Sequence, residues 1–267
     1  MKKILLVIVL FGIYGCSYLS SHIIYYKDLP SLDAKYGIGT QIFEWVDSTR
    51  YEDFTQTEDD YRRLIVQIWY PAIIADVNAK PAPYLDHPSE QIEAIAEQLE
   101  IPSYLLTNIK NISTNSYFNA PIISDQGAFP MLMFSHGLGG MKNQNSIQIE
   151  ALVHQGYIIV APDHAYDANI TVFNDGTIAD FRSGSESIVT EEQFWEYRLP
   201  QLQKRTDDIN HIYNKVKLLL EDKKSIWKYV NIEKIGIFGH SFGGATSIMA
   251  AHSNSKIDAV FLLDAWT

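Results

Sequence analysis

A serine lies at a strand-to-helix turn that suits nucleophilic catalysis. The pattern G-x-S-x-G occupies residues 239–243 with Ser241 at its centre, after an apolar run at 235–238 and before small residues typical of a helix start. The flanking glycines allow a sharp turn because they carry no Cβ atoms. The hydroxyl of Ser241 would then stand off the sheet, and the helix N-terminus would favour developing negative charge. We predict Ser241 as the nucleophile of an acyl-transfer reaction; the alternative is a glycine-rich turn with an incidental serine.

A glycine-rich segment after another apolar run supplies a second part of this chemistry. Residues 134–140 read FSHGLGG and follow the run at 130–134. Acyl transfer needs N–H donors aimed at the tetrahedral oxyanion. One comes from the residue after the nucleophile, here Phe242, and the other comes from a loop of this kind. The segment lacks the Lys-Ser/Thr of a P-loop and the spacing of a dinucleotide site, so it is interpreted as an oxyanion loop.

A candidate acid is present, but no histidine lies at the place expected for the base. Asp264 ends the apolar run 259–263, where α/β folds place working residues, and a buried carboxylate there would orient a histidine. Asp163, beside His164, is a rival. The expected chain order is serine, acid, histidine, yet no histidine follows Asp264, and His164 is the one stand-in that the sequence offers. The preferred hypothesis is that the chain is a fragment of a longer protein whose later residues carry the histidine and the final strands.

The elements that must position these residues alternate along the chain. Short apolar runs typical of buried strands alternate with helix-like stretches, which predicts an α/β fold with a mostly parallel sheet and helices on both faces. Arg205 and Asp208, three apart on the longest helix, are expected to form an exposed ion pair. Asp-Gly at 175–176 predicts a hairpin. The expected strands are 41–46, 63–70 (ended by Pro71), 130–134, 157–161, 235–238 and 259–263, and the expected helices are 145–154, 191–220 and 245–252.

Composition limits the possible functions. The chain has 267 residues, a formal net charge of −11 and 46% hydrophobic residues, which suits one large globular domain or two small ones. The acidic balance argues against a nucleic-acid partner, which would require basic patches. A single cysteine excludes an internal disulfide and a cysteine-based zinc cluster.

The first residues resemble an export signal. Two lysines precede an apolar run at 4–13, which is too short to span a bilayer but fits a secretory signal peptide. Ile13-Tyr14-Gly15-Cys16 resembles a bacterial lipobox, in which the cysteine is acylated after cleavage. We therefore predict a signal peptide at 1–15, a hydrolase domain at 16–267 and a lipid anchor on Cys16. The protein would be an envelope lipoprotein; the alternative is an ordinary signal peptide and a secreted or periplasmic protein.

Three motifs together resemble the platelet-activating-factor acetylhydrolase family, the α/β-hydrolase serine esterases related to lipoprotein-associated phospholipase A2. The motifs are FSHGLG at 134–139, GHSFGG at 239–244 and LDAW at 263–266. The resemblance implies an α/β-hydrolase fold, with Ser241 as nucleophile, Asp264 as triad acid, and Leu138 and Phe242 as oxyanion-hole amides. It also implies an enzyme without metal or cofactor that cleaves short or oxidised acyl chains from phospholipids.

Other functions stay open. The same fold serves dienelactone-hydrolase-like and polyester-cleaving esterases, and a non-enzymatic envelope lipoprotein could keep it as a binding module. The apolar stretch 101–109 is either an interfacial helix that contacts the membrane or a cap that packs on the body. The expected partners are an ester or phospholipid substrate and the membrane surface reached through the lipid anchor.

Overall fold

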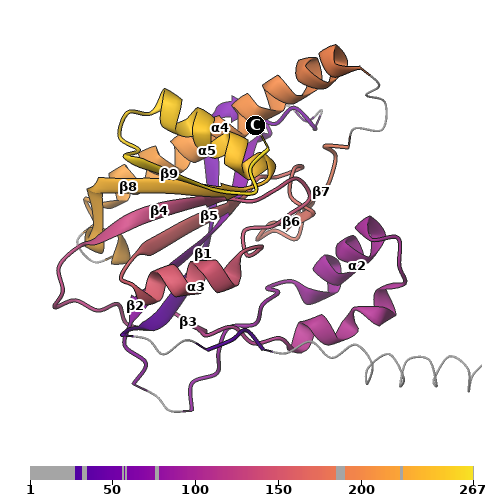
Figure 1. The fold of residues 1–267 in the computed structure, drawn as a ribbon. Coiled ribbons are helices and arrows are strands. Elements are labelled where there is room, and N and C mark those ends of the chain that lie inside the picture. Colours follow the sequence, from indigo (N-terminus) through magenta and orange to yellow (C-terminus); the bar gives the residue numbers. More distant parts are fainter. Residues whose placement is uncertain are drawn as a thin grey trace, which may run out of the picture.

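A mixed, mostly parallel sheet forms the centre of the structure (Figure 1). The computed structural model describes residues 28–31, 35–55, 57, 59–75, 78–184, 190–222 and 225–266; the predicted signal peptide and Cys16 lie outside them. In the described chain the strand order is β3-β1-β2-β5-β4-β8-β9. Strands β5, β4, β8 and β9 run parallel, whereas β2 is antiparallel to β1 and β5. The strands are β1 (Gly37–Tyr51), β2 (Tyr61–Ala72), β3 (Ser116–Phe118), β4 (Phe129–Ser135), β5 (Ile158–Asp163), β8 (Val230–His240) and β9 (Ala259–Leu263).

Helices cover both faces of this sheet, as predicted. They are α3 (Ser146–His154), α4 (Glu191–Leu219) and α5 (Phe242–Ser253). Successive strand residues point to opposite faces, and two neighbours on β2 show the result. Ile68 joins a buried cluster with Ile212 of α4, whereas Trp69 joins another with Val153 of α3. The central strands of the sheet are thus buried on both faces, which explains their near-continuous apolar runs.

The segment between β2 and β4 forms a cap rather than one interfacial helix. It contains α2 (Pro88–Gln98) and the short 3₁₀ helices η1 (Ser103–Leu105) and η2 (Thr107–Asn111). Leu106 is buried in a cluster with Ile92 of α2, while the side chain of Tyr104 is 48% exposed. The same cluster contains Met141, which follows β4, and Ile170 of the later hairpin, so residues 101–109 pack on the body through part of their apolar surface. The predicted hairpin is present as β6 (Ile170–Val172) and β7 (Ile178–Asp180).

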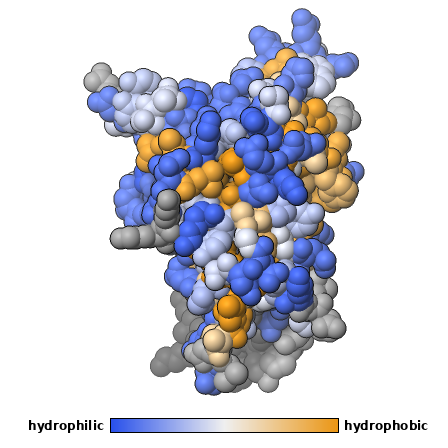
Figure 2. Space-filling model, turned by 90° about the vertical axis from the view of Figure 1, so that its left-hand side faces the viewer, coloured by the Kyte–Doolittle hydropathy of each residue, from blue (hydrophilic) through white to orange (hydrophobic). Residues whose placement is uncertain are grey.

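Two features of the sheet differ from the expectations. Strand β2 continues past Pro71, which pairs with Ile38 of β1, so the proline does not end the strand. Strand β9 is the outermost strand of the described sheet, and its residues Val260, Phe261 and Leu262 are exposed. The side of the molecule shown in Figure 2 is predominantly hydrophilic with separate apolar patches, as is usual for a globular protein.

Candidate active site

Ser241 occupies a strained turn between β8 and α5. Its backbone has φ 52° and ψ −122°, a conformation that non-glycine residues rarely adopt. A Cβ atom added to Gly239 would lie less than 3.0 Å from the backbone of Gly243 and Gly244, and one added to Gly243 would collide with the carbonyl oxygen of Ser135. The two motif glycines are required because strand, turn and helix approach one another through their backbones. The predicted strand–turn–helix geometry is confirmed.

The two predicted oxyanion amides come from two segments, the start of α5 and the loop after β4. A Cβ atom on Gly137 would be 3.4 Å from the Cβ of Ser241, so the loop after β4 lies against the serine. The amide of Gly139 donates to the Asp167 carbonyl (3.0 Å), whereas the described residues provide no acceptor for the amide of Leu138. Phe242 is the first residue of α5, where an N–H has no intrahelical acceptor. The side chains of Leu138 and Phe242 pack in one cluster.

Asp264 is joined to Ser241 through the backbone. The amide of Ser241 donates to the carbonyl of Leu263 (3.1 Å), and the amide of Trp266 donates to the carbonyl of Ser241 (3.0 Å). Asp264, between these two contacts, has φ 46°. It is exposed, so the expectation of a buried carboxylate is wrong for the described structure. The reason is its place after β9, the outermost strand of the described sheet.

His164 does not serve Ser241. Its Nε2 lies 3.0 Å from the hydroxyl of Ser135, and its Nδ1 lies 2.9 Å from Oδ2 of Asp208. All three side chains are fully buried. Burial, with the nearby charge of Arg205, lowers the pKa of His164 to about 4, so the ring is neutral at pH 7. The interpretation of His164 as a stand-in base for Ser241 is wrong because both ring nitrogens are already bonded elsewhere.

The rival acid also has another role. Asp163, at the end of β5, is fully buried and accepts hydrogen bonds from the amide (2.6 Å) and the ammonium group (3.1 Å) of Lys142. Lys142 also contacts Asp86 in the cap (3.0 Å). Asp163 therefore ties the segment after the oxyanion loop to β5 and to the cap.

The expected exposed ion pair on α4 is not present. Arg205 and Asp208 are both fully buried, and Asp208 pairs with Arg62 of β2 (2.7 Å) and Arg50 of β1 (2.8 Å). Burial alone would raise the pKa of Asp208, but Arg62 and His164 hold it well below its usual range. A signal was present in the sequence, because Leu202, Arg205 and Ile209 recur at helical spacing and place Arg205 in the apolar stripe.

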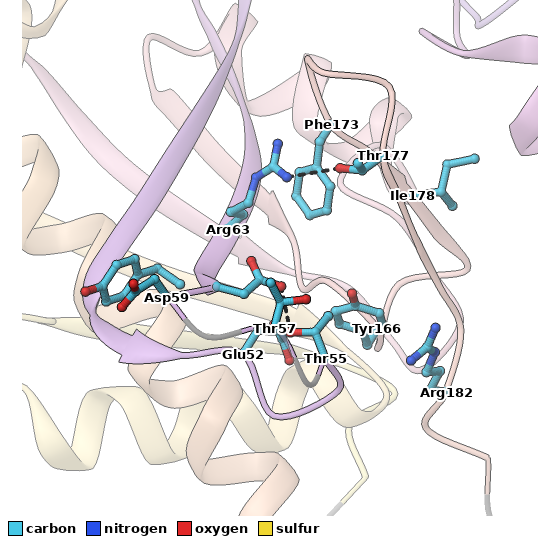
Figure 3. A pocket seen from close by; sticks show the side chains of 12 residues that line it. Glu52, Thr55, Thr57, Asp59, Arg63, Tyr166, Phe173, Thr177, Ile178 and Arg182 are labelled. Carbon is cyan, nitrogen blue, oxygen red and sulfur yellow. Dashed lines mark hydrogen bonds between the residues drawn. The ribbon is translucent and has the colours of Figure 1, made fainter.

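A cavity of about 500 Å³ lies apart from Ser241, between the turn joining β1 to β2 and the β6–β7 hairpin (Figure 3). The guanidinium of Arg63 stacks 4.0 Å from the centre of the Phe173 ring and donates to Thr177 (3.0 Å). Arg182 lies over the ring of Tyr166 at 4.9 Å. Because Ser241 does not line this cavity, its volume does not identify the substrate site.

Comparison with known proteins identifies the family of the chain. The family model described as "Platelet-activating factor acetylhydrolase, isoform II" matches residues 27–267. The chain belongs to this family. The dog (Canis lupus familiaris) platelet-activating factor acetylhydrolase is 28% identical over 175 residues, covering 58% of this chain and 39% of the relative. The guinea pig (Cavia porcellus) protein is 26% identical over 204 residues, covering 66% and 45%. The chain thus spans about two fifths of the length of these curated relatives.

A solved structure supports the same fold. A ferulic acid esterase from Streptomyces cinnamoneus superposes with a TM-score of 0.68 at 20% identity, covering 87% of this chain and 60% of that one. The likeness and the sheet order agree with the predicted α/β-hydrolase fold. In this member of the platelet-activating factor acetylhydrolase family, Ser241 and Phe242 follow β8, Asp264 follows β9, and the loop with Leu138 follows β4, so all three segments lie at the carboxyl ends of parallel strands. No helix of the described residues combines the length and apolar character needed to cross a bilayer.

Proposed function

We propose that the protein is a serine carboxylic ester hydrolase of the platelet-activating factor acetylhydrolase type that removes short or oxidised acyl chains from phospholipids. The observation that carries the proposal is the backbone of Ser241 at φ 52°, held between β8 and α5 with the oxyanion loop against it. Family membership supports the phospholipid ester as substrate.

The first half-reaction forms an acyl-enzyme. The Oγ of Ser241 attacks the ester carbonyl carbon, and the carbonyl π electrons move onto oxygen, where the amides of Leu138 and Phe242 donate to the oxyanion. The serine proton passes to a histidine base, which Asp264 orients. The carbonyl re-forms, the bond to the glycerol oxygen breaks, and the histidine protonates this leaving oxygen.

The second half-reaction releases the acyl group. Water gives a proton to the same histidine and attacks the acyl carbon, and the oxyanion again accepts from the two amides. The collapse breaks the bond to Oγ, which takes the proton back from the histidine. A carboxylic acid leaves and Ser241 is restored.

The test compares Ser241→Ala with Ser253→Ala, an exposed serine at the far end of the same helix. The full-length protein would be assayed on a 1-alkyl-2-acetyl-glycerophosphocholine and on p-nitrophenyl acetate, and labelled with a fluorophosphonate probe. We expect Ser241→Ala to lower kcat by about 10⁴-fold or more and to abolish labelling, with Ser253→Ala like the wild type. Labelling with hydrolysis of the simple ester alone would favour another esterase of this fold. Absence of labelling in the wild type would favour a binding module.

We also propose that the protein is exported and anchored to the bacterial envelope through an acylated Cys16. The basic and apolar start of the chain and the lipobox-like segment support this. Cells grown with labelled palmitate should incorporate label into the wild type, and Cys16→Ser should lose the label and leave the membrane fraction. Because Cys16 is the only cysteine of the chain, retention of label by this variant would contradict the anchor.

A further inference from the structure

A fully buried chain of polar groups lies beneath the oxyanion loop, where β4, β5 and α4 meet. Asp208 and Arg205 come from α4, His164 follows β5, and Ser135 ends β4. Their side chains, together with that of His136, are 0% exposed. His164 bridges Asp208 (2.9 Å) and Ser135 (3.0 Å), and Nη2 of Arg205 lies 3.3 Å from the Ser135 hydroxyl.

The protonation state of each buried polar group determines whether it donates or accepts a hydrogen bond. Asp208 is ionised and can only accept, so Nδ1 of His164 carries the proton and donates to it. Since the ring is neutral, Nε2 is an acceptor, and the hydroxyl of Ser135 donates to it. Arg205, which has only donors, completes the chain at the lone pair of the same hydroxyl. Each member therefore has one consistent role.

The same groups hold three consecutive residues of the loop. Ser135 is held through its hydroxyl, and Arg205 also donates to the carbonyl of His136. The Nε2 of His136 accepts from the amide of His164 (3.1 Å), and its Nδ1 donates to the carbonyl of Gly137 (2.7 Å). The next residue is Leu138, whose amide has no acceptor within the described residues.

This buried chain of polar groups is connected like a catalytic triad, but a substrate cannot reach it. Ser135 lies in the sheet ladder opposite Gly239, and its carbonyl oxygen is so close to Gly243 that even a methyl group would not fit between them. A carbonyl carbon cannot reach its hydroxyl. The buried hydrogen bonds can act only by holding the loop.

We propose that Asp208, His164 and Arg205 are positioning residues that hold the amide of Leu138 in place for the oxyanion, acting through Ser135 and His136. The inference rests on the proposed hydrolase function. Donors stabilise an oxyanion most when they are fixed before the reaction, and buried hydrogen bonds, such as those that Nη2 of Arg205 and both ring nitrogens of His164 make, hold their neighbours more rigidly than exposed ones. If the loop were released from these buried polar groups, substrate binding would be unchanged, but the hydrogen bond from the Leu138 amide to the oxyanion in the transition state would be weaker.

The test breaks one link and leaves the ion pairs of Asp208 intact. Ser135→Ala removes the hydroxyl that His164 and Arg205 share, and Ser116→Ala is the matched control. Ser116 is a buried serine of β3 with a hydroxyl bonded to Glu150 (2.7 Å), far along the sheet order from β4. Both variants would be assayed in the full-length protein on p-nitrophenyl acetate, with an aliphatic trifluoromethyl ketone as an inhibitor that places an oxyanion in the same hole.

We expect Ser135→Ala to lower kcat by about 10- to 100-fold, somewhat less than the loss of a whole oxyanion donor. KM should change by less than about twofold, and the inhibitor should bind weaker by the same factor as kcat falls. Hydrogen exchange of the peptide containing Leu138 should be faster than in Ser116→Ala, and by more than the exchange of the peptides of β2 in the same variant, which separates a released loop from a general loss of stability.

The outcomes separate the two proposals. If the wild type is active and Ser241→Ala is not, but Ser135→Ala matches Ser116→Ala in kcat, inhibitor affinity and exchange, the positioning role is overturned alone. A parallel loss of kcat and inhibitor affinity at constant KM supports it. If the wild type hydrolyses no ester, the proposed function fails and the positioning role fails with it.

Discussion

The turn at Ser241 predicts that Gly239→Ala is one of the most damaging single-methyl additions available to this chain. The added Cβ would lie within 3.0 Å of three backbone atoms, namely the carbonyl carbon and oxygen of Gly243 and the nitrogen of Gly244. Backbone atoms cannot move aside by a change of rotamer, so β8 and α5 would have to separate. The position of Ser241 between them would change as well.

The magnitude follows from comparison with two other glycines. Overpacking costs typically about 1–3 kcal/mol, and a clash with backbone alone places Gly239→Ala at the upper end, about 3 kcal/mol. Gly127 has φ 79° and nothing within 4 Å of an added Cβ. Gly127→Ala would cost about 1–2 kcal/mol for the left-handed backbone, partly offset by about 0.4–1 kcal/mol of lost unfolded-state entropy. Gly184 has neither constraint, so Gly184→Ala should be neutral or stabilise slightly.

Urea unfolding of the three variants, followed by tryptophan fluorescence, measures these differences. The unfolding free energy should be highest for Gly184→Ala, lower for Gly127→Ala and lowest for Gly239→Ala. The m-values should be similar if each variant unfolds in one step. Gly239→Ala should also lose ester hydrolysis in its folded fraction, whereas the other two should keep it. The steric reasoning would be refuted by a Gly239→Ala variant that is at least as stable as Gly127→Ala.

Two further predictions concern the buried groups on and around α4. Asp208→Asn should destabilise the protein by about 3–5 kcal/mol because it leaves the buried Arg62 without its main charge partner; a loss below 1 kcal/mol in urea unfolding would contradict this. His164 has a folded pKa of about 4 against 6.5 in the unfolded chain, so between these values only the unfolded chain binds the proton. Stability should therefore fall by up to about 3 kcal/mol as pH drops from 6.5 to 4, and His164→Gln should flatten that dependence of the urea midpoint.

The strands of the parallel half of the sheet could be predicted because each carries its own signal. Apolar runs of four or five residues predicted β4, β5, β8 and β9, and each run overlaps its strand. The start of β8 was missed because Glu233 and Lys234 are exposed and interrupt the apolar pattern. Strand β3 has three residues and pairs with β1, far away in the sequence, so nothing local distinguishes it from a loop. Local patterns predict elements; long-range pairing does not show in them.

The candidate site divides in the same way. The turn at Ser241 is determined by glycines within two residues of it, so its geometry could be predicted from the motif. The burial of Arg205 and Asp208 could not be predicted from charge, since charged residues are almost always exposed unless paired. The partners of Asp208, Arg62 and His164, come from β2 and from the end of β5, more than forty residues away. Helical spacing placed Arg205 in line with Leu202, but only the tertiary structure shows what it bonds.

The exposed position of Asp264 is compatible with its proposed role as the acid, because the backbone determines where the residue lies. Ser241 makes one backbone hydrogen bond on each side of Asp264. Its amide donates to the carbonyl of Leu263, and its carbonyl accepts from the amide of Trp266. Strands β8 and β9 are also in register at His240 and Leu263, so neither end of this contact can slip without breaking the ladder. Ser241 and Asp264 are therefore held at one edge of the sheet. In the proposed mechanism, a histidine that bonds both side chains would itself cover the carboxylate, so the proposal does not require that Asp264 be buried beforehand.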